Sequence, residues 1–119
     1  MSDTRTFSGA RALICAPDGP PLSDKTATHF ISDAWEADAR LVAVPVERLA
    51  PGFLDLATGI AGEVFQKFVN YGIGLAIIGD IEDRKAASRA LRDFVYEANN
   101  GKTTWFVDDV AALEKKLSV

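Results

Sequence analysis

Carboxylate side chains follow the apolar runs of this chain, and their spacing is the first feature that could support chemistry. Asp18, Asp80 and Asp108 each come shortly after a predicted strand. Because the carboxyl ends of parallel strands share one edge of a sheet, where ligands usually bind, these residues form a candidate ligand edge. Clustered carboxylates can hold Mg²⁺, or one of them could accept a phosphoryl group. The structural alternative is stronger, because Asp is favoured in turns and helix caps. We therefore predict no metal site and no cofactor.

A second set of residues shares one side of a long helix predicted over 53–71, with a start a turn or two later, near Asp55, as the alternative. This candidate interaction surface consists of Asp55, Thr58, Gly59, Gly62, Glu63, Gln66 and Asn70. Each glycine inside a helix costs about 1 kcal/mol relative to alanine. Close approach by another chain or element would explain that cost. The surface thus predicts contact with a protein partner or with a second copy of the chain. The alternative is a solvated face with Gly59 in a frayed first turn.

Nucleophilic catalysis is not indicated by the reactive residues. His29, the only histidine, projects away from the apolar side of its predicted helix, and Cys15, the only cysteine, lies in an apolar strand. No base accompanies Ser23 or Ser88, as a nucleophile pair would require. Neither of the glycine-rich phosphate-binding motifs follows a strand. We therefore expect a protein that is not an enzyme.

The elements that would position these residues alternate between strand and helix periodicity. Strands are expected at 4–7, 10–15, 41–46, 75–78 and 103–107, the first two as a hairpin. Four helices are expected: after Ser23, over 53–71, around 91–98, and after Asp108 or Asp109. Gly101 is expected as a left-handed cap of the third. The apolar face of the first would consist of Ala27, Phe30, Ile31, Ala34 and Trp35. Phe65 and Phe94 are expected in the core.

This order, β(β)αβαβαβα, predicts a single-domain α/β fold. Alternating strands and helices favour a mostly parallel sheet of four or five strands with about four helices.

Composition narrows the classes of partner. The chain has 119 residues, which is the size of one domain. Its 17 acidic and 13 basic residues give a net charge of −4, which argues against nucleic-acid and anionic-membrane binding. No apolar run approaches the roughly 20 residues of a membrane span, and residues 1–10 do not resemble a signal peptide. We therefore expect a cytoplasmic domain without nucleic-acid or membrane partners.

Four segments carry a family resemblance. They read FLDLATGIAGEVFQKFVNY (53–71), LAIIGD (75–80), SRALRDFVYEANNG (88–101) and WFVDDVAALEKKL (105–117). They resemble the bacterial family named domain of unknown function 4180, and QKFVNY and RDFVYEANNG are the most distinctive strings. The likeness is looser over the N-terminal strand and helix. The family has no assigned activity, so the resemblance implies no functional residues.

A weaker resemblance is to the anti-sigma-factor antagonist (STAS) domains, whose order of strands and helices is similar. These are regulatory modules that bind partner proteins, with a phosphorylatable serine at the start of the helix corresponding to 53–71. This chain has no serine there, so Thr58 would have to accept phosphate or Asp55 imitate it. The resemblance implies a non-enzymatic regulatory or interaction domain. The alternatives are a small-molecule or Mg²⁺-dependent phosphate site at the acidic edge and a structural homodimer.

Overall fold

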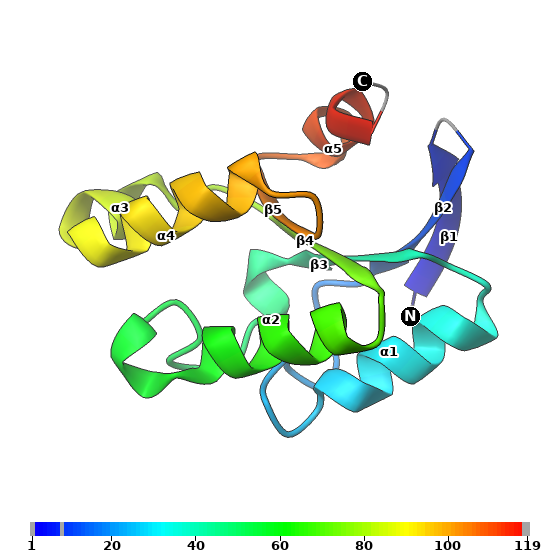
Figure 1. Ribbon diagram of the computed structural model, residues 1–119, viewed down its shortest axis with the longest axis horizontal. Helices are drawn as coiled ribbons and strands as arrows, with labels where there is room; N and C mark the ends of the chain where they lie inside the picture. The colour runs from blue at the N-terminus through cyan, green and yellow to red at the C-terminus, as the bar shows by residue number, and fades with distance from the viewer. Residues whose placement is uncertain (1, 8, 118–119) are drawn as a thin grey trace.

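Five strands form one sheet in the order β1-β2-β3-β4-β5 (Figure 1). The computed structural model describes residues 2–7 and 9–117. The strands are β1 (Ser2–Phe7), β2 (Ala10–Cys15), β3 (Leu41–Pro45), β4 (Gly74–Ile78) and β5 (Thr104–Val107). β1 pairs antiparallel with β2, and all later pairs are parallel. The predicted α/β fold, the hairpin and the mostly parallel sheet are therefore confirmed.

The described residues form five α-helices, one more than the sequence predicts. They are α1 (Ala27–Glu36), α2 (Ile60–Asn70), α3 (Glu82–Ala87), α4 (Arg89–Asn100) and α5 (Val110–Leu117), with short 3₁₀ helices η1 (Val46–Arg48) and η2 (Leu56–Thr58). The additional helix is α3, which has six residues and none of them buried. A helix without an apolar stripe leaves no periodic signal in the sequence.

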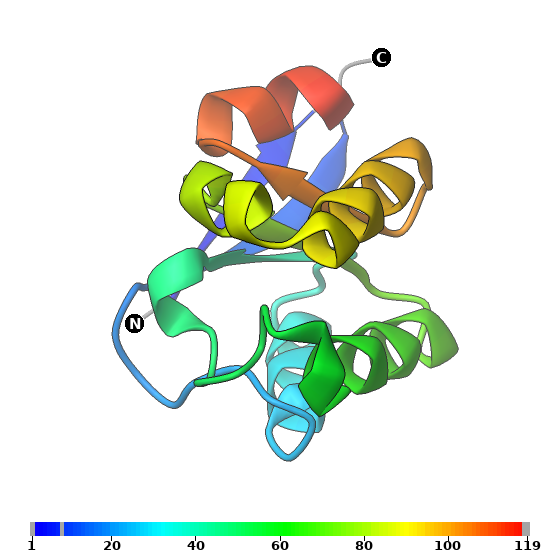
Figure 2. The same ribbon diagram turned by 90° about the vertical axis from the view of Figure 1, so that its left-hand side faces the viewer.

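The helices divide unequally between the two faces of the sheet. Each parallel strand lies beside the one before it, and α1, α2 and α4 pack against the same face. Figure 2 shows α1 and α2 on one side of the sheet and α5 on the other. Successive side chains of a strand point to opposite faces, so Val42 and Val44 meet the three helices while Ala43 faces α5.

The segment before α2 corrects the predicted helix over 53–71. α2 begins only at Ile60. A tight turn containing Gly52, with φ of +84°, comes first, and Asp55 then caps η2 by accepting an N–H in its first turn. Gly59 has φ of +77°, a left-handed conformation that no helix interior adopts. Gly59 therefore precedes the helix and is not one of its glycines.

Two helix caps also differ from expectation. The Ser23 hydroxyl accepts the N–H of Lys25 at 3.1 Å in a turn before α1, so Ser23 is not the N-cap of that helix. Gly101 follows α4 with φ of −87°, which is not left-handed. By contrast, the Asp109 carboxylate accepts a first-turn N–H of α5 at 2.8 Å, as predicted for this position or its neighbour.

Three aromatic residues are less buried than the helical pattern predicts. Phe65 and Phe94 are only partly buried, and their rings stack at 5.2 Å between α2 and α4. Trp35 is 53% exposed. All three lie at the margins of their helices' apolar faces, where periodicity does not show how far the covering neighbours extend.

Candidate functional site

The candidate ligand edge is only partly assembled. Asp80 and Asp108 line one open hollow of about 570 Å³ beyond the ends of β4 and β5. Asp18 follows β2, which lies two strands away from β4 in the sheet. Neighbouring strands are about 4.8 Å apart, so Asp18 is separated from Asp80 by roughly 10 Å of sheet. Asp18 does not line this hollow.

Asp80, Glu82 and Lys85 of this acidic hollow are engaged in local structure. Asp80 accepts the N–H of Glu82 at 2.9 Å, and the Glu82 carboxylate pairs with Lys85 at 2.6 Å. Within residues 2–7 and 9–117, no three carboxylate, imidazole or thiol groups gather as a metal ion would need. Asp80 thus acts as the turn cap that its sequence context predicts.

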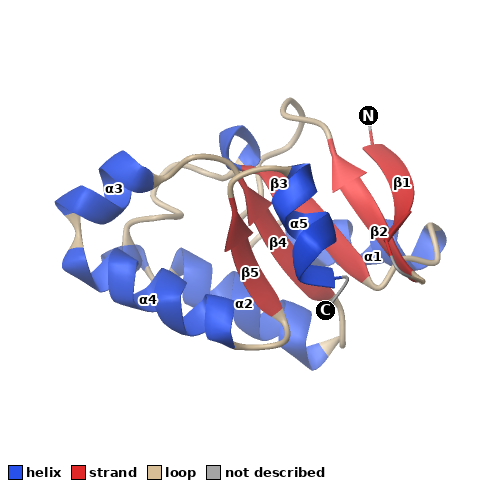
Figure 3. Cartoon of the chain, turned by 90° about the horizontal axis from the view of Figure 1, so that it is seen from above, coloured by secondary structure: helices blue, strands red, loops and turns tan. Residues whose placement is uncertain are grey.

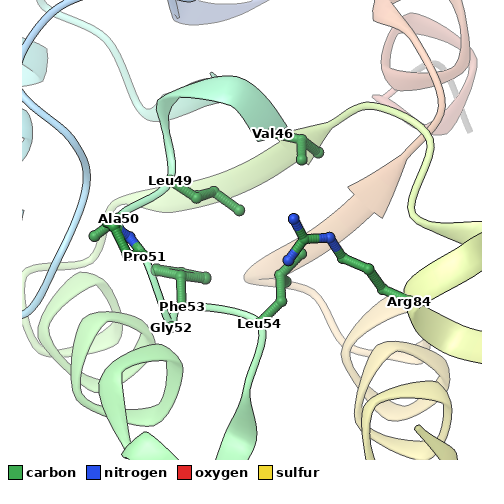
Figure 4. A pocket seen from close by; sticks show the side chains of 8 residues that line it. All are labelled: Val46, Leu49, Ala50, Pro51, Gly52, Phe53, Leu54 and Arg84. Carbon is green, nitrogen blue, oxygen red and sulfur yellow. The ribbon is translucent and has the colours of Figure 1, made fainter. Parts of the chain in front are cut away.

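A second hollow at the same edge was not predicted. It measures about 210 Å³ and is lined by Val46, Leu49, Ala50, Pro51, Gly52, Phe53, Leu54 and Arg84. Figure 4 shows the Arg84 side chain reaching from α3 into this hollow. Sequence reasoning concentrated on carboxylates and did not anticipate α3, so it had no means of placing Arg84 opposite the loop after β3.

The candidate interaction surface is split between the outer side of α2 and the loop before it. On α2, Gly62, Glu63, Gln66 and Asn70 are exposed. The Gln66 amide donates to the Asn70 side-chain oxygen at 2.8 Å. A Cβ added at Gly62 would meet nothing within 4 Å. Gly62 therefore has no packing role within the domain.

The remaining predicted surface residues hold the loop together. The Thr58 hydroxyl lies 2.8 Å from the carbonyl oxygens of both Gly52 and Asp55 and donates to them. It also accepts the N–H of Ile60 at 3.3 Å. Gly59 supplies the left-handed turn into α2. Asp55, Thr58 and Gly59 thus have structural roles at the entrance to α2.

Large apolar side chains adjoin the polar part of α2, and sequence reasoning missed them. Val69, Tyr71 and Trp35 are 47%, 49% and 53% exposed. The Trp35 and Tyr71 rings meet edge to face with centroids 5.4 Å apart. A signal was present for Val69, because it lies three residues after Gln66 and seven after Gly62, which places it on the same side of a helix.

A further hollow lies at the opposite edge of the sheet, where the parallel strands begin. It measures about 280 Å³ and lies between the ends of α2 and α5. Arg40 and Lys102 stand at its rim, and Phe68 and Leu117 are among its apolar walls. It is separate from both hollows at the carboxyl edge, with which it shares no lining residue.

The fold and these surfaces define an α/β domain with one mostly parallel sheet. The family described as "Domain of unknown function (DUF4180)" matches residues 7–117, and the chain belongs to that family. No curated protein matches the chain, and no solved structure matches it either. Within the described part of the chain, each helix is too short or too polar to cross a membrane.

Proposed function

We propose that this domain is a cytoplasmic regulatory module that acts by binding a protein partner. The contact surface is here called the α2 face, and it consists of Gly62, Glu63, Gln66, Val69 and Asn70 with Trp35 and Tyr71. The observation that carries this assignment is the exposed apolar group at its end. Trp35, Val69 and Tyr71 come from α1, α2 and the residue after α2, and each exposes about half of its surface.

The composition of the α2 face suits an interface. Tyr and Trp are the side chains most often found at the energetic centre of protein contacts, with polar residues around them. Here the Trp35 and Tyr71 rings pack edge to face, while the side-chain amides of Gln66 and Asn70 supply hydrogen-bond donors and acceptors. Open space at Gly62 would allow a partner to approach the helix backbone closely.

Charge favours a different protein over a second copy as the occupant. Glu63 is exposed on the α2 face, and no ion pair to it is present among the described residues. The nearest basic residue of the helix, Lys67, donates instead to the Asp24 carbonyl oxygen at 2.6 Å. Two copies of this face would bring like charges together, whereas a partner with basic side chains would complement it.

Catalysis is not part of this role. His29 is exposed on α1, whereas Cys15 is buried in β2. Neither residue lines any of the hollows at the carboxyl edge of the sheet. A binding surface, unlike a nucleophile–base pair, requires only the exposed side chains already described.

The test combines capture with titration of the captured protein. Wild-type protein, Trp35→Ala and Gly62→Leu are used as baits in native cell extract, and Tyr96→Ala is the matched control because Tyr96 is 70% exposed on α4. A protein retained by wild type and control is then purified and titrated calorimetrically. We expect Trp35→Ala to weaken binding by about tenfold or more, Gly62→Leu to abolish it, and added salt to weaken it.

Two results would overturn this function. A captured protein that binds both α2-face variants as well as wild type would place its contact elsewhere. A concentration-dependent dimer in sedimentation velocity that Gly62→Leu abolishes would show that the face pairs with a second copy. Gly62→Leu is expected to stay folded, because the side chain enters open space.

A further inference from the structure

The hollow beside Arg84 has the form of a small ligand site. Buried Phe53 and Leu54 form part of its wall, and partly buried Val46 and Leu49 contribute further apolar surface. An apolar protein cavity of about 150 Å³ is large enough to bind benzene. At about 210 Å³, this hollow has room for one ring and a small polar group.

Arg84 places an exposed positive charge beside these apolar side chains. Figure 4 shows its guanidinium between the side chains of Val46 and Leu54. The only ion pair among the described residues joins Glu82 to Lys85 on the same helix and leaves Arg84 without a carboxylate. Within residues 2–7 and 9–117 the Arg84 side chain makes no hydrogen bond to the protein, so its five N–H donors are available to a ligand.

The charges around this hollow favour an anion over a cation. No Asp or Glu lines it, although the chain has 17 acidic residues against 13 basic ones, and a nearby carboxylate, Asp55, lines an adjoining hollow that shares Leu54 and Arg84 with it. The neighbouring hollow at the same edge is lined by Asp80, Glu82 and Asp108 and would repel an anion. A guanidinium holds a carboxylate through two parallel N–H···O bonds.

We propose that this hollow binds a small carboxylate with an apolar body of about one ring. Arg84 contacts the carboxylate, while Val46, Leu49 and Leu54 contact the apolar body. The hollow lies beyond the carboxyl end of β3, where Val46 begins its lining. The site is independent of the α2 face, with which it shares no residue.

The test uses three probes that separate charge from apolar bulk. ¹⁵N-labelled protein is titrated at constant ionic strength with sodium benzoate, with benzamide and with sodium acetate. We expect benzoate to produce saturable amide shifts within residues 46–54 and at Arg84. Benzamide lacks the charge and acetate lacks the ring, so the affinity for each should be at least about tenfold lower than for benzoate.

Two substitutions at Arg84 and one matched control assign the contact. Arg84→Gln removes the charge and should weaken benzoate binding about tenfold, bringing it to the level of benzamide. Arg84→Lys keeps the charge but loses the planar fork, so its affinity should fall between the two. Arg40→Gln is the control, because Arg40 lines the hollow at the opposite edge and should not affect the titration. Arg84 is exposed, so its variants should remain folded.

Three outcomes would overturn the site. Equal binding of benzoate and benzamide would show an apolar hollow without anion selectivity. Shifts that map to the opposite edge and disappear in Arg40→Gln would place the anion site there. Absence of saturable shifts at millimolar benzoate would show that Arg84 only covers apolar surface with its side-chain stem. None of these results bears on partner binding by the α2 face, which is tested with different variants.

Discussion

The two faces of the sheet are covered by different numbers of helices. On one face, large side chains such as Val44 and Ile77 meet three helices. On the other, Ala43 and Ala76 are paired in register and belong to one buried cluster with Leu113 of α5. α5 has eight residues, and Figure 3 shows it lying over this face of the sheet. The same side also carries larger residues, and Trp105 on β5 is only partly buried there. The two layers therefore differ in the number of helices that cover the sheet, three on one face and one on the other.

This difference also locates the proposed functions. The α2 face and the Arg84 hollow are both built by segments that pack on the thicker side, including α1, α2 and the loop containing Phe53. Three helices of unequal length leave margins where apolar side chains remain half covered, as at Trp35 and Val69. The α5 side has Leu113 as the one buried residue of its helix. Binding surfaces are thus expected on the thicker side.

The largest predicted effect is the loss of a ring from the thicker layer. Phe68 lies on α2 and is 0% exposed. Phe68→Ala should lower the free energy of unfolding by about 3–5 kcal/mol, because it removes a fully buried ring. Urea unfolding measures the change, and Tyr96→Ala, at an exposed aromatic, should stay within about 0.5 kcal/mol of wild type. A loss below about 2 kcal/mol for Phe68→Ala would contradict the described packing of α2.

The equivalent truncation in the thinner layer should cost less. Leu113 lies on α5, on the side that packs on the sheet, and is 0% exposed. We expect Leu113→Ala to cost about 2–3 kcal/mol, near the lower end for Leu→Ala, because a short helix can settle into the space left. Urea unfolding gives the cost, and hydrogen exchange should show faster opening of α5 while α2 stays protected. A cost as large as that of Phe68→Ala would mean that both layers contribute equally.

Enlarging an alanine tests the same thin layer from the opposite direction. Ala43 is 0% exposed, with Ala76 beside it on the next strand. Ala43→Val should destabilise the domain by about 1–3 kcal/mol, because the added methyl groups press against α5. Thr6→Val is the control, since Thr6 is exposed on β1 and the change should stay within about 0.5 kcal/mol. Unchanged stability of Ala43→Val would reveal unfilled space under α5.

Much of this architecture is predictable from the sequence because the inner strands are covered on both faces. Continuous apolar runs placed β3, β4 and β5 within one residue of their observed ends. The start of α2 was wrong because Phe53 and Leu54 continue the helical spacing by coincidence, whereas in the structure they are buried in a turn. The spacing of apolar residues indicates which positions are buried, but it does not show whether the backbone there is a helix or a turn.

The candidate sites were less predictable, because they depend on which segments become neighbours. Asp80 and Asp108 line the same hollow, since β4 and β5 are adjacent. Asp18 does not join them, because the strand order separates β2 from that end of the sheet. Arg84 could not be assigned a role without knowing that α3 stands opposite the loop after β3. Long-range placement of this kind has no local signal in the sequence.

The smallest predicted effect is a gain in stability on the outer side of the thicker layer. Gly62 lies inside α2, and a Cβ there would meet nothing within 4 Å. Gly62→Ala should raise the free energy of unfolding by up to about 1 kcal/mol, because alanine favours the helix and needs no new space. Gly79→Ala is the opposing control and should lower stability, since the φ of Gly79 is +147° and the added Cβ would lie 2.6 Å from a methyl group of Val46.

Gly62 weakens its own helix without aiding packing inside the domain, so we expect its role to be contact with a partner. The same Gly62→Ala variant should therefore weaken capture of the α2-face partner less than Gly62→Leu does, because a methyl group blocks less of the approach. A destabilised Gly62→Ala, measured by urea unfolding, would instead mean that the glycine serves the domain's own fold and would remove one support for the α2 face.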